Sequence, residues 1–369
     1  MALRSWVEID LKQLSYNYSL YKRSLSGNIE IMAVIKANAY GHGDIEVART
    51  LQNQGVHNWA VATLDEAIRL RQNSIVGQIL VLGYSPIEQA SLLMQYDITQ
   101  TVVSLKHAAK LAEINSKIKV QFAIDTGMNR IGIDGENTKE CESIIREYSE
   151  KLNVTGIFTH LSQADKFDTD SKKFTEKQIK QFSAVEDSIR DLGFPNMHFL
   201  NSAGGLFYYS DRSTFVRLGI ILYGLKPDAG IKLPEEIRSV LSWYSTVAMV
   251  KEVKPGKAIG YGGNYVTSCA MKIATITTGY ADGYNRSLSN GGYVLINGAK
   301  APIVGNICMD QFMVDVSGIE NVDMGTKVTL IGNDLDETIT ADGLAKIAQT
   351  IGYEIVCNVS TRVNRIYNH

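Results

Sequence analysis

A lysine followed by a tyrosine and two glycines is the first group in this chain whose types and spacing could do chemistry. Segment 33–43 reads Ala-Val-Ile-Lys-Ala-Asn-Ala-Tyr-Gly-His-Gly, so Lys36 ends an apolar run and Tyr40 follows four residues later. Burial lowers the pKa of a lysine, and a neutral amine can attack a carbonyl to form a Schiff base. We expect the amides of Gly41 and Gly43 to stay open to an anion. A buried strand that ends in a solvent-reaching lysine and a turn explains the same residues.

The flanking patterns predict the fold that would position Lys36. Residues 29–35 are almost entirely apolar, as in a strand covered on both faces, and a helix is expected from Asp44. Eight such strands alternate with helices, which predicts an α/β fold with a (β/α)8 TIM-like barrel. A doubly wound open sheet is the second choice. In a barrel, the chemistry lies at the C-terminal ends of the strands, where Lys36 stands.

The predicted elements of this first part are short and closely spaced. We predict strands at 29–37, 59–63, 78–83, 98–104, 119–126, 154–161, 197–202 and 215–223. We predict helices at 11–25, 44–54, 64–72, 86–95, 105–115, 137–151, 173–192 and 203–208.

The pattern changes after about residue 234. Short β-rich runs separated by glycine turns predict a mainly β second domain, so we divide the chain into 1–236 and 237–369. The first strand, 6–9, precedes the barrel pattern and is expected to pair with the β domain. The runs lie at 245–253, 272–278, 293–296, 313–316 and 327–331, with one helix at 340–350.

Composition restricts the class of protein. The 369 residues carry a net charge of −2, which gives no general attraction for nucleic acid. The four cysteines are widely separated and the histidines do not cluster, so neither a metal site nor a disulfide framework is predicted. We expect a cytoplasmic enzyme with a small-molecule substrate. The abrupt start at the first strand is also compatible with the cytosolic domain of a longer, membrane-anchored protein.

Polar residues follow several of the predicted barrel strands. Each alone has an ordinary explanation: a surface arginine, a hydrogen-bonded interior histidine or a turn residue. Their recurrence at one rim is the stronger argument, because a pocket needs convergent polar groups on an apolar base. These residues are Arg130, His160, Asn201, Ser202, Arg217, Gly219 and Ile220.

Three strings of the sequence closely resemble the alanine racemase family. They are the lysine string at 33–43, Gly-Tyr-Ala-Asp-Gly-Tyr at 279–284 and Gly-Asn-Ile-Cys-Met-Asp-Gln at 305–311. In that family the lysine carries pyridoxal 5'-phosphate (PLP). The resemblance therefore implies a PLP-dependent racemase that interconverts L- and D-alanine and supplies D-amino acids for peptidoglycan precursors.

The resemblance also implies roles for the rim residues. Arg217 matches an arginine that faces the pyridine nitrogen, and His160 matches a residue that supports it. An arginine holds its proton, so the cofactor is a weaker electron sink and clean α-proton exchange is favoured. Arg130 matches a residue near the substrate carboxylate. The predicted cofactor-binding residues are Lys36, Tyr40, His160, Asn201, Ser202, Arg217, Gly219, Ile220 and Thr361.

Two further matches imply a dimer. Racemisation removes the α-proton from one face and returns it to the other, which two acid/base groups achieve most simply. Lys36 serves one face, and Tyr280 matches the family's second base, which acts in the site of the other subunit. Met309 matches a residue whose backbone amide contacts the substrate carboxylate across the interface. We therefore expect a homodimer with composite sites.

The chain departs from the family pattern at two positions. Ala123 stands where the family commonly has a lysine, which supports the arginine that corresponds to Arg130. We expect a bound anion such as chloride to take over that support. Thr361 stands where alanine racemases have a tyrosine. Threonine leaves more space, so we expect L- and D-serine to be accepted as well, as in the serine racemases of vancomycin-resistance systems.

Two other functions remain in competition. One is a PLP-dependent amino-acid decarboxylase of the same architecture, which the 279–284 string and Arg217 disfavour. The other is a non-enzymatic PLP-binding homeostasis protein, which would have no C-terminal β domain. Exchange of the α-proton of the amino acid with deuterated solvent discriminates a racemase from a PLP-binding protein without catalytic activity.

Overall fold

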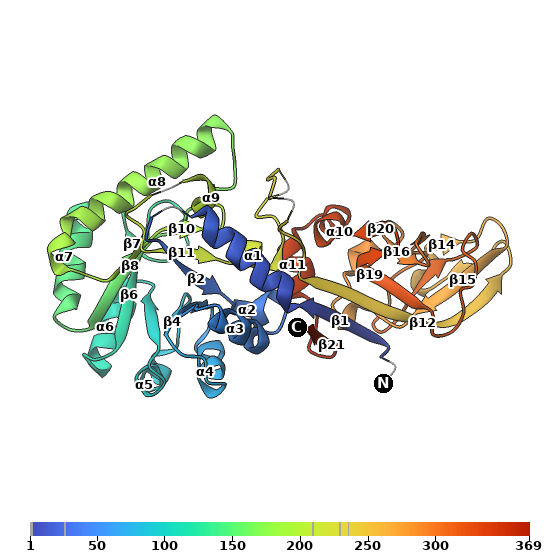
Figure 1. Ribbon diagram of the computed structural model, residues 1–369, viewed down its shortest axis with the longest axis horizontal. Helices are drawn as coiled ribbons and strands as arrows, with labels where there is room; N and C mark the ends of the chain where they lie inside the picture. The colour runs from blue at the N-terminus through green and yellow to red at the C-terminus, as the bar shows by residue number, and fades with distance from the viewer. Residues whose placement is uncertain (1–2, 26, 209, 229, 235) are drawn as a thin grey trace.

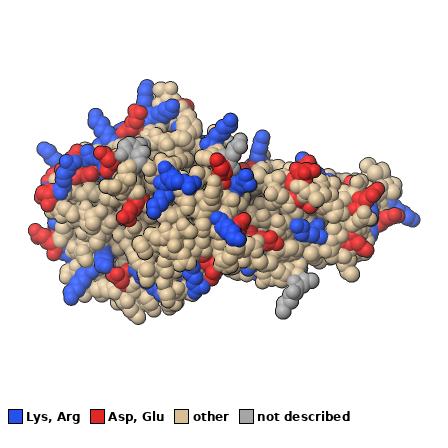
Figure 2. All heavy atoms as spheres, viewed as in Figure 1, with Lys and Arg blue, Asp and Glu red and all other residues tan. Residues whose placement is uncertain are grey.

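The computed structural model describes residues 3–25, 27–208, 210–228, 230–234 and 236–369. The described chain forms a barrel lobe and a lobe of mainly antiparallel strands, side by side along the long axis of the molecule (Figure 1). Acidic and basic side chains are intermixed over the face that Figure 2 presents. None of the described helices is long and apolar enough to cross a membrane.

A parallel sheet forms the barrel, as the alternating pattern predicted. Its strands follow the order β10-β11-β2-β3-β4-β5-β6-β8-β9. β9 and β10 are consecutive and separated only by Phe199, so the ends of the sheet meet and the barrel nearly closes. The strands are β2 (Glu30–Val34), β3 (Asn58–Val61), β4 (Gln78–Val81), β5 (Thr99–Val102), β6 (Lys119–Asp125), β8 (Asn153–Phe158), β9 (Asn196–His198), β10 (Leu200–Asn201) and β11 (Phe215–Leu218), with β7 (Ile133–Asp134) paired to β6.

The outer helices begin at the polar caps that the sequence contains. Asp10 accepts from the Gln13 amide at 2.8 Å, and Thr63 forms a capping box with Glu66. The helices are α1 (Leu11–Ser24), α2 (Lys36–Tyr40), α3 (Asp44–Asn53), α4 (Leu64–Gln72), α5 (Ala90–Gln95), α6 (Leu105–Ile114), α7 (Thr138–Ser149), α8 (Thr169–Ser188) and α9 (Gly204–Phe207).

The second lobe is built on a long strand that also contacts the N-terminal strand. β12 pairs antiparallel with β1, and β1 pairs parallel with β21. Its strands are β1 (Ser5–Asp10), β12 (Leu241–Val253), β13 (Ala258–Ile259), β14 (Tyr265–Val266), β15 (Met271–Ile276), β16 (Tyr293–Ile296), β17 (Ala299–Pro302), β18 (Phe312–Asp315), β19 (Lys327–Asp334), β20 (Glu337–Ile339) and β21 (Asn364–Asn368). The helices are α10 (Ala341–Ala348) and α11 (Gly352–Cys357). One cluster contains buried apolar residues of both lobes, and a second, smaller cluster lies within the second lobe. The division after residue 236 stays a prediction.

Several elements differ from the sequence-based expectation, and two of these differences lie beside the site. The strands β7, β13, β14, β17, β20 and β21 were also not predicted. The strand predicted at 215–223 is wrong at its end, because β11 stops at Leu218 and a 3₁₀ turn, η3 (Ile220–Tyr223), follows. Residues 215–222, which are mostly apolar, are buried throughout, so periodicity alone could not locate that change. The short helix α11 was not predicted, and it brings the second lobe against the barrel mouth.

Candidate active site

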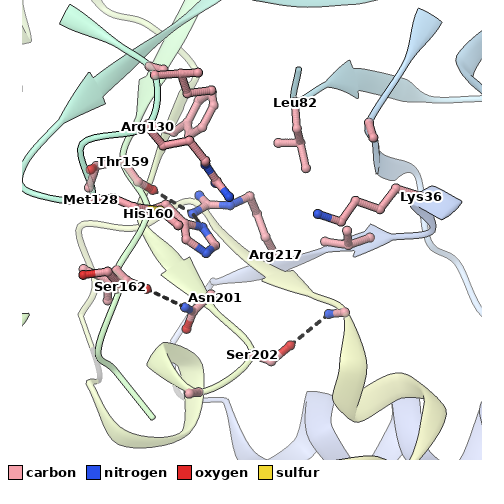
Figure 3. A pocket seen from close by; sticks show the side chains of 18 of the residues that line it. Lys36, Leu82, Met128, Arg130, Thr159, His160, Ser162, Asn201, Ser202 and Arg217 are labelled. Carbon is pink, nitrogen blue, oxygen red and sulfur yellow. Dashed lines mark hydrogen bonds between the residues drawn. The ribbon is translucent and has the colours of Figure 1, made fainter. Parts of the chain in front are cut away.

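A cavity of about 450 Å³ lies at the C-terminal ends of the barrel strands. This volume is within the range of small-ligand pockets. Figure 3 shows the side chains of Lys36, Arg130 and Arg217 directed into it from the turn after β2, the loop after β6 and the strand β11. The predicted residues that line it are Lys36, Tyr40, Arg130, His160, Asn201, Ser202, Arg217, Gly219 and Ile220.

The chain reverses its helical hand directly after Lys36. Ala37, Asn38, Ala39 and Tyr40 have φ between +52° and +54°, so α2 is a single left-handed turn. Left-handed backbone costs non-glycine residues roughly 1–2 kcal/mol each. The turn is held by i to i+4 bonds, such as the Ala39 amide to the Ile35 carbonyl at 2.9 Å. Backbone strain of this kind persists only where the surrounding structure maintains it, and it is common at functional sites.

The expectation that the glycine amides stay open to an anion is wrong. The Gly41 amide donates to the Ala37 carbonyl at 3.0 Å, and the Gly43 amide donates to the Asn38 carbonyl at 2.9 Å. These glycines allow close packing instead. A Cβ on Gly41 would lie 2.1 Å from the Val356 carbonyl oxygen.

The surroundings of Lys36 favour its neutral form. Burial lowers the pKa of the ammonium, and the charges of Arg130 and Arg217 lower it further. Cys357 and Glu66 act in the opposite direction. These surroundings increase the share of the neutral amine, which is the form that can act as a base or a nucleophile.

The two terminal nitrogens of the buried Arg217 are surrounded by hydrogen-bond acceptors. Its guanidinium donates to His198 Nδ1 at 2.7 Å, to the Thr159 carbonyl at 2.7 Å and to His160 Nδ1 at 3.2 Å. His198 Nε2 in turn lies 2.8 Å from Gln121 Oε1, which places the proton of this imidazole on Nε2. Burial and Arg130 lower the pKa of Arg217 to about 9, so the guanidinium stays charged at neutral pH.

Hydrogen-bond donors gather at the other end of the cavity. Ser202 Oγ accepts the Gly219 amide at 2.9 Å, which fixes its hydroxyl beside η3. Ile220 is the first residue of that turn, so its amide has no acceptor within the turn. The Tyr40 hydroxyl packs so closely on Gly219 that a Cβ there would lie 2.7 Å from it. Hydroxyls and a free amide suit a phosphate group.

Asn201 has a different set of partners. Its Nδ2 donates to the Leu161 carbonyl at 2.9 Å, and its Oδ1 accepts the Gly204 amide at 2.8 Å. These two bonds fix the loop that carries Ser202. Direct contact of Asn201 with a cofactor stays a prediction.

Three predicted residues lie outside the cavity lining and share one surface of the second lobe. Tyr280 and Met309 are 43% and 53% exposed, and Thr361 is exposed as well. The Tyr280 amide donates to the carbonyl of Cys308 at 3.0 Å. Arg362 bonds Asp310 at 2.7 Å, which ties the segment of Thr361 to that of Met309. In a single chain this surface faces outward.

Ala123 borders the cavity, and Arg130 is exposed at its mouth. Among the described residues, none forms an ion pair with Arg130. An anion beside this arginine therefore stays a prediction.

Sequence reasoning missed several residues of the site. His198 and Gln121 are polar positions on buried strands, a signal that was present. Tyr353 of α11 lines the cavity and packs its ring 6.0 Å from that of Tyr40. The sequence signal at Glu66 is only its spacing from Thr63, which is that of a capping box, and this spacing indicates a helix start and no role in the site.

Comparison with known proteins agrees with this geometry. Residues 9–227 match the model of the alanine racemase N-terminal domain, and residues 240–367 match that of the C-terminal domain. The alanine racemase of Halothermothrix orenii is 41% identical over 99% of this chain and 97% of its own. The chain belongs to the alanine racemase family. The solved alanine racemase of Clostridium difficile 630 superposes with a TM-score of 0.92 at 37% identity, over 100% of this chain and 96% of that one.

A solved alanine racemase also bears on the cofactor. The Bartonella henselae enzyme contains covalently bound pyridoxal phosphate, and it superposes with a TM-score of 0.87 at 28% identity, over 99% of this chain and 100% of that one. Family membership over both lobes favours a racemase over the decarboxylase and the single-domain carrier.

Proposed function

We propose that this protein is a PLP-dependent alanine racemase. The observation that carries the proposal is the convergence of Lys36, Arg217 and the Tyr40–Ser202–Ile220 donor group on one cavity, in a chain of this family. The test is chiral analysis of products from L-alanine, with and without added PLP. D-alanine that depends on PLP supports the proposal, and PLP binding without D-alanine refutes it.

The cavity suits PLP by its donor set. Lys36 would hold the aldehyde carbon, while Tyr40, Ser202 and the Ile220 amide would hold the phosphate, and Arg217 would face the ring nitrogen. When bound, PLP withdraws electron density from the substrate Cα and so makes its proton more acidic. Arg217 keeps its proton at neutral pH, so it would donate a hydrogen bond to the pyridine nitrogen without protonating that nitrogen.

Residues on two faces would move the proton. Lys36, whose neutral form is favoured by burial and by Arg130 and Arg217, takes or returns the proton on one face through Nζ. Tyr280 of a second copy takes or returns it on the other face through its hydroxyl. The Arg130 guanidinium and the Met309 amide orient the substrate carboxylate.

The exposed positions of Tyr280 and Met309 support a homodimer with composite sites. Mixing inactive Lys36→Ala and Tyr280→Phe variants tests it. Statistical exchange makes half of the dimers mixed, each with one complete site, so about a quarter of the wild-type activity returns. If exchange is verified and nothing returns, Tyr280 does not act in the partner's site.

The substrate range is expected to depend on Thr361. In the proposed dimer this residue, with Tyr280 and Met309, would border the partner's site, and we infer that the space it leaves there admits serine. Thr361→Tyr should lower the serine-to-alanine ratio of kcat/KM; an unchanged ratio contradicts the pocket argument.

We also infer that an anion such as chloride lies beside Ala123 and supports Arg130. Chloride removal should raise the KM for alanine, and a chloride-independent KM argues against the anion.

A further inference from the structure

The first residue after Lys36 is held by a side chain from another part of the barrel. The Ala37 amide donates to Glu66 Oε1 at 2.6 Å. Glu66 lies in the first turn of α4, the helix that follows β3. The ladder between β2 and β3 reaches as far as the Ile35 amide, which donates to the Ala60 carbonyl at 3.0 Å. Glu66 therefore continues the pairing of the two strand ends by one further bond.

The same carboxylate is fixed at its other oxygen. Glu66 Oε2 accepts the Ala62 amide at 2.8 Å and the Thr63 amide at 3.3 Å. Its position is thus set by β3 and by the capping box of α4, independently of the lysine segment. A carboxylate that is fixed by backbone amides at one oxygen can hold a further peptide N–H at the other.

The place of this bond gives it a consequence for Lys36. Ala37 is the first of the four residues in the left-handed turn, and its peptide bond begins at the Lys36 carbonyl. Fixing that peptide constrains the backbone at Lys36 and therefore the direction in which its side chain enters the cavity. The carboxylate also contributes negative charge near Nζ, whose other charged or titratable neighbours among the described residues include Arg130, Arg217, Cys357 and His160.

We propose that Glu66 is a positioning residue for Lys36: its carboxylate clamps the Ala37 peptide to the end of β3 and offsets part of the positive charge around the lysine. The effect of this contact on catalysis rests on the proposed function. The clamp itself belongs to the folded chain.

The critical variant is Glu66→Gln. An amide has one acceptor oxygen, so it cannot accept from Ala37 and from Ala62 and Thr63 at once, and its NH2 group then meets a backbone N–H. Glu66→Asp keeps the charge but is one methylene too short to span both sides. Asp65→Asn is the matched control, because Asp65 is an exposed carboxylate of the same helical turn.

Two readouts on the full chain test the clamp. Hydrogen exchange of peptides spanning Ala37 is measured on the protein as purified. Loss of a bond to a charged acceptor should speed exchange about 10-fold or more in Glu66→Gln and Glu66→Asp, but not in Asp65→Asn. The second readout is amine labelling of Lys36 against pH, after hydroxylamine has removed any bound carbonyl compound. Glu66→Gln should move the midpoint to lower pH, and Glu66→Asp should move it less.

A purely structural role is separated by Thr63→Ala. This variant removes the hydroxyl that accepts the Glu66 amide, so it weakens the start of α4 without removing the bond to Ala37. If Thr63→Ala reproduces both effects, or if Glu66→Gln behaves as Asp65→Asn, the proposal is overturned. A wild-type protein that forms no D-alanine would refute the proposed function, yet both readouts would still report on the clamp.

Discussion

Replacing Arg217 by lysine tests how the site holds its buried charge. The two terminal nitrogens of this guanidinium contact five acceptors: the carbonyls of Thr159, His198 and Phe199 at 2.7, 3.2 and 3.3 Å, and the rings of His198 and His160 at 2.7 and 3.2 Å. A lysine has one nitrogen with three N–H groups, so at least two acceptors lose their donor. Hydrogen bonds to a charged group contribute about 1.5–3 kcal/mol each, so Arg217→Lys should lower the free energy of unfolding by about 3–6 kcal/mol.

The assay is urea unfolding followed by circular dichroism at neutral pH. Arg190→Lys is the control, because Arg190 forms its ion pair with Asp187 at the surface and should lose only about 0–1 kcal/mol. If the two variants lose the same small amount, the acceptors around Arg217 do not need its fork geometry. That result would refute the reasoning.

Three further outcomes are expected. Burial lowers the pKa of His42 and of His107 to about 4, whereas an unfolded histidine titrates near 6.5; protons therefore bind the unfolded chain first as the pH falls. The unfolding free energy should drop by about 2 kcal/mol per histidine between pH 7 and pH 5, and equal urea midpoints at both pH values would contradict this. Gly43→Ala should cost about 2 kcal/mol or more in the same assay, because the glycine has φ +98° and a Cβ would lie 1.9 Å from the Tyr367 hydroxyl; Tyr367→Phe in the same chain should recover part of the loss. Tyr353→Ala should raise the KM for alanine more than it lowers kcat in steady-state kinetics, since it removes a ring that lines the cavity, and an unchanged KM would exclude that role.

Local patterns in the sequence determined the elements of the fold and the rim of the site. Alternation of apolar runs with capped helices is a property of neighbouring residues, so the barrel strands and the start of α4 could be located without coordinates. Lys36, Arg217 and Ser202 could be placed together for the same reason, because parallel strands bring their C-terminal ends to one rim. The roles of these residues came from likeness to a family and not from spacing.

Only the tertiary structure decided how the rim residues are held. The left-handed turn after Lys36 contradicts local propensity, and it is maintained by contacts from other segments, including Glu66. Likewise, the His198 ring meets Arg217 because two strands adjoin, and Tyr353 reaches the cavity because α11 packs on the barrel. Such contacts join residues far apart in the chain. They follow from packing and closure of the barrel, which the spacing of residues along the sequence does not encode.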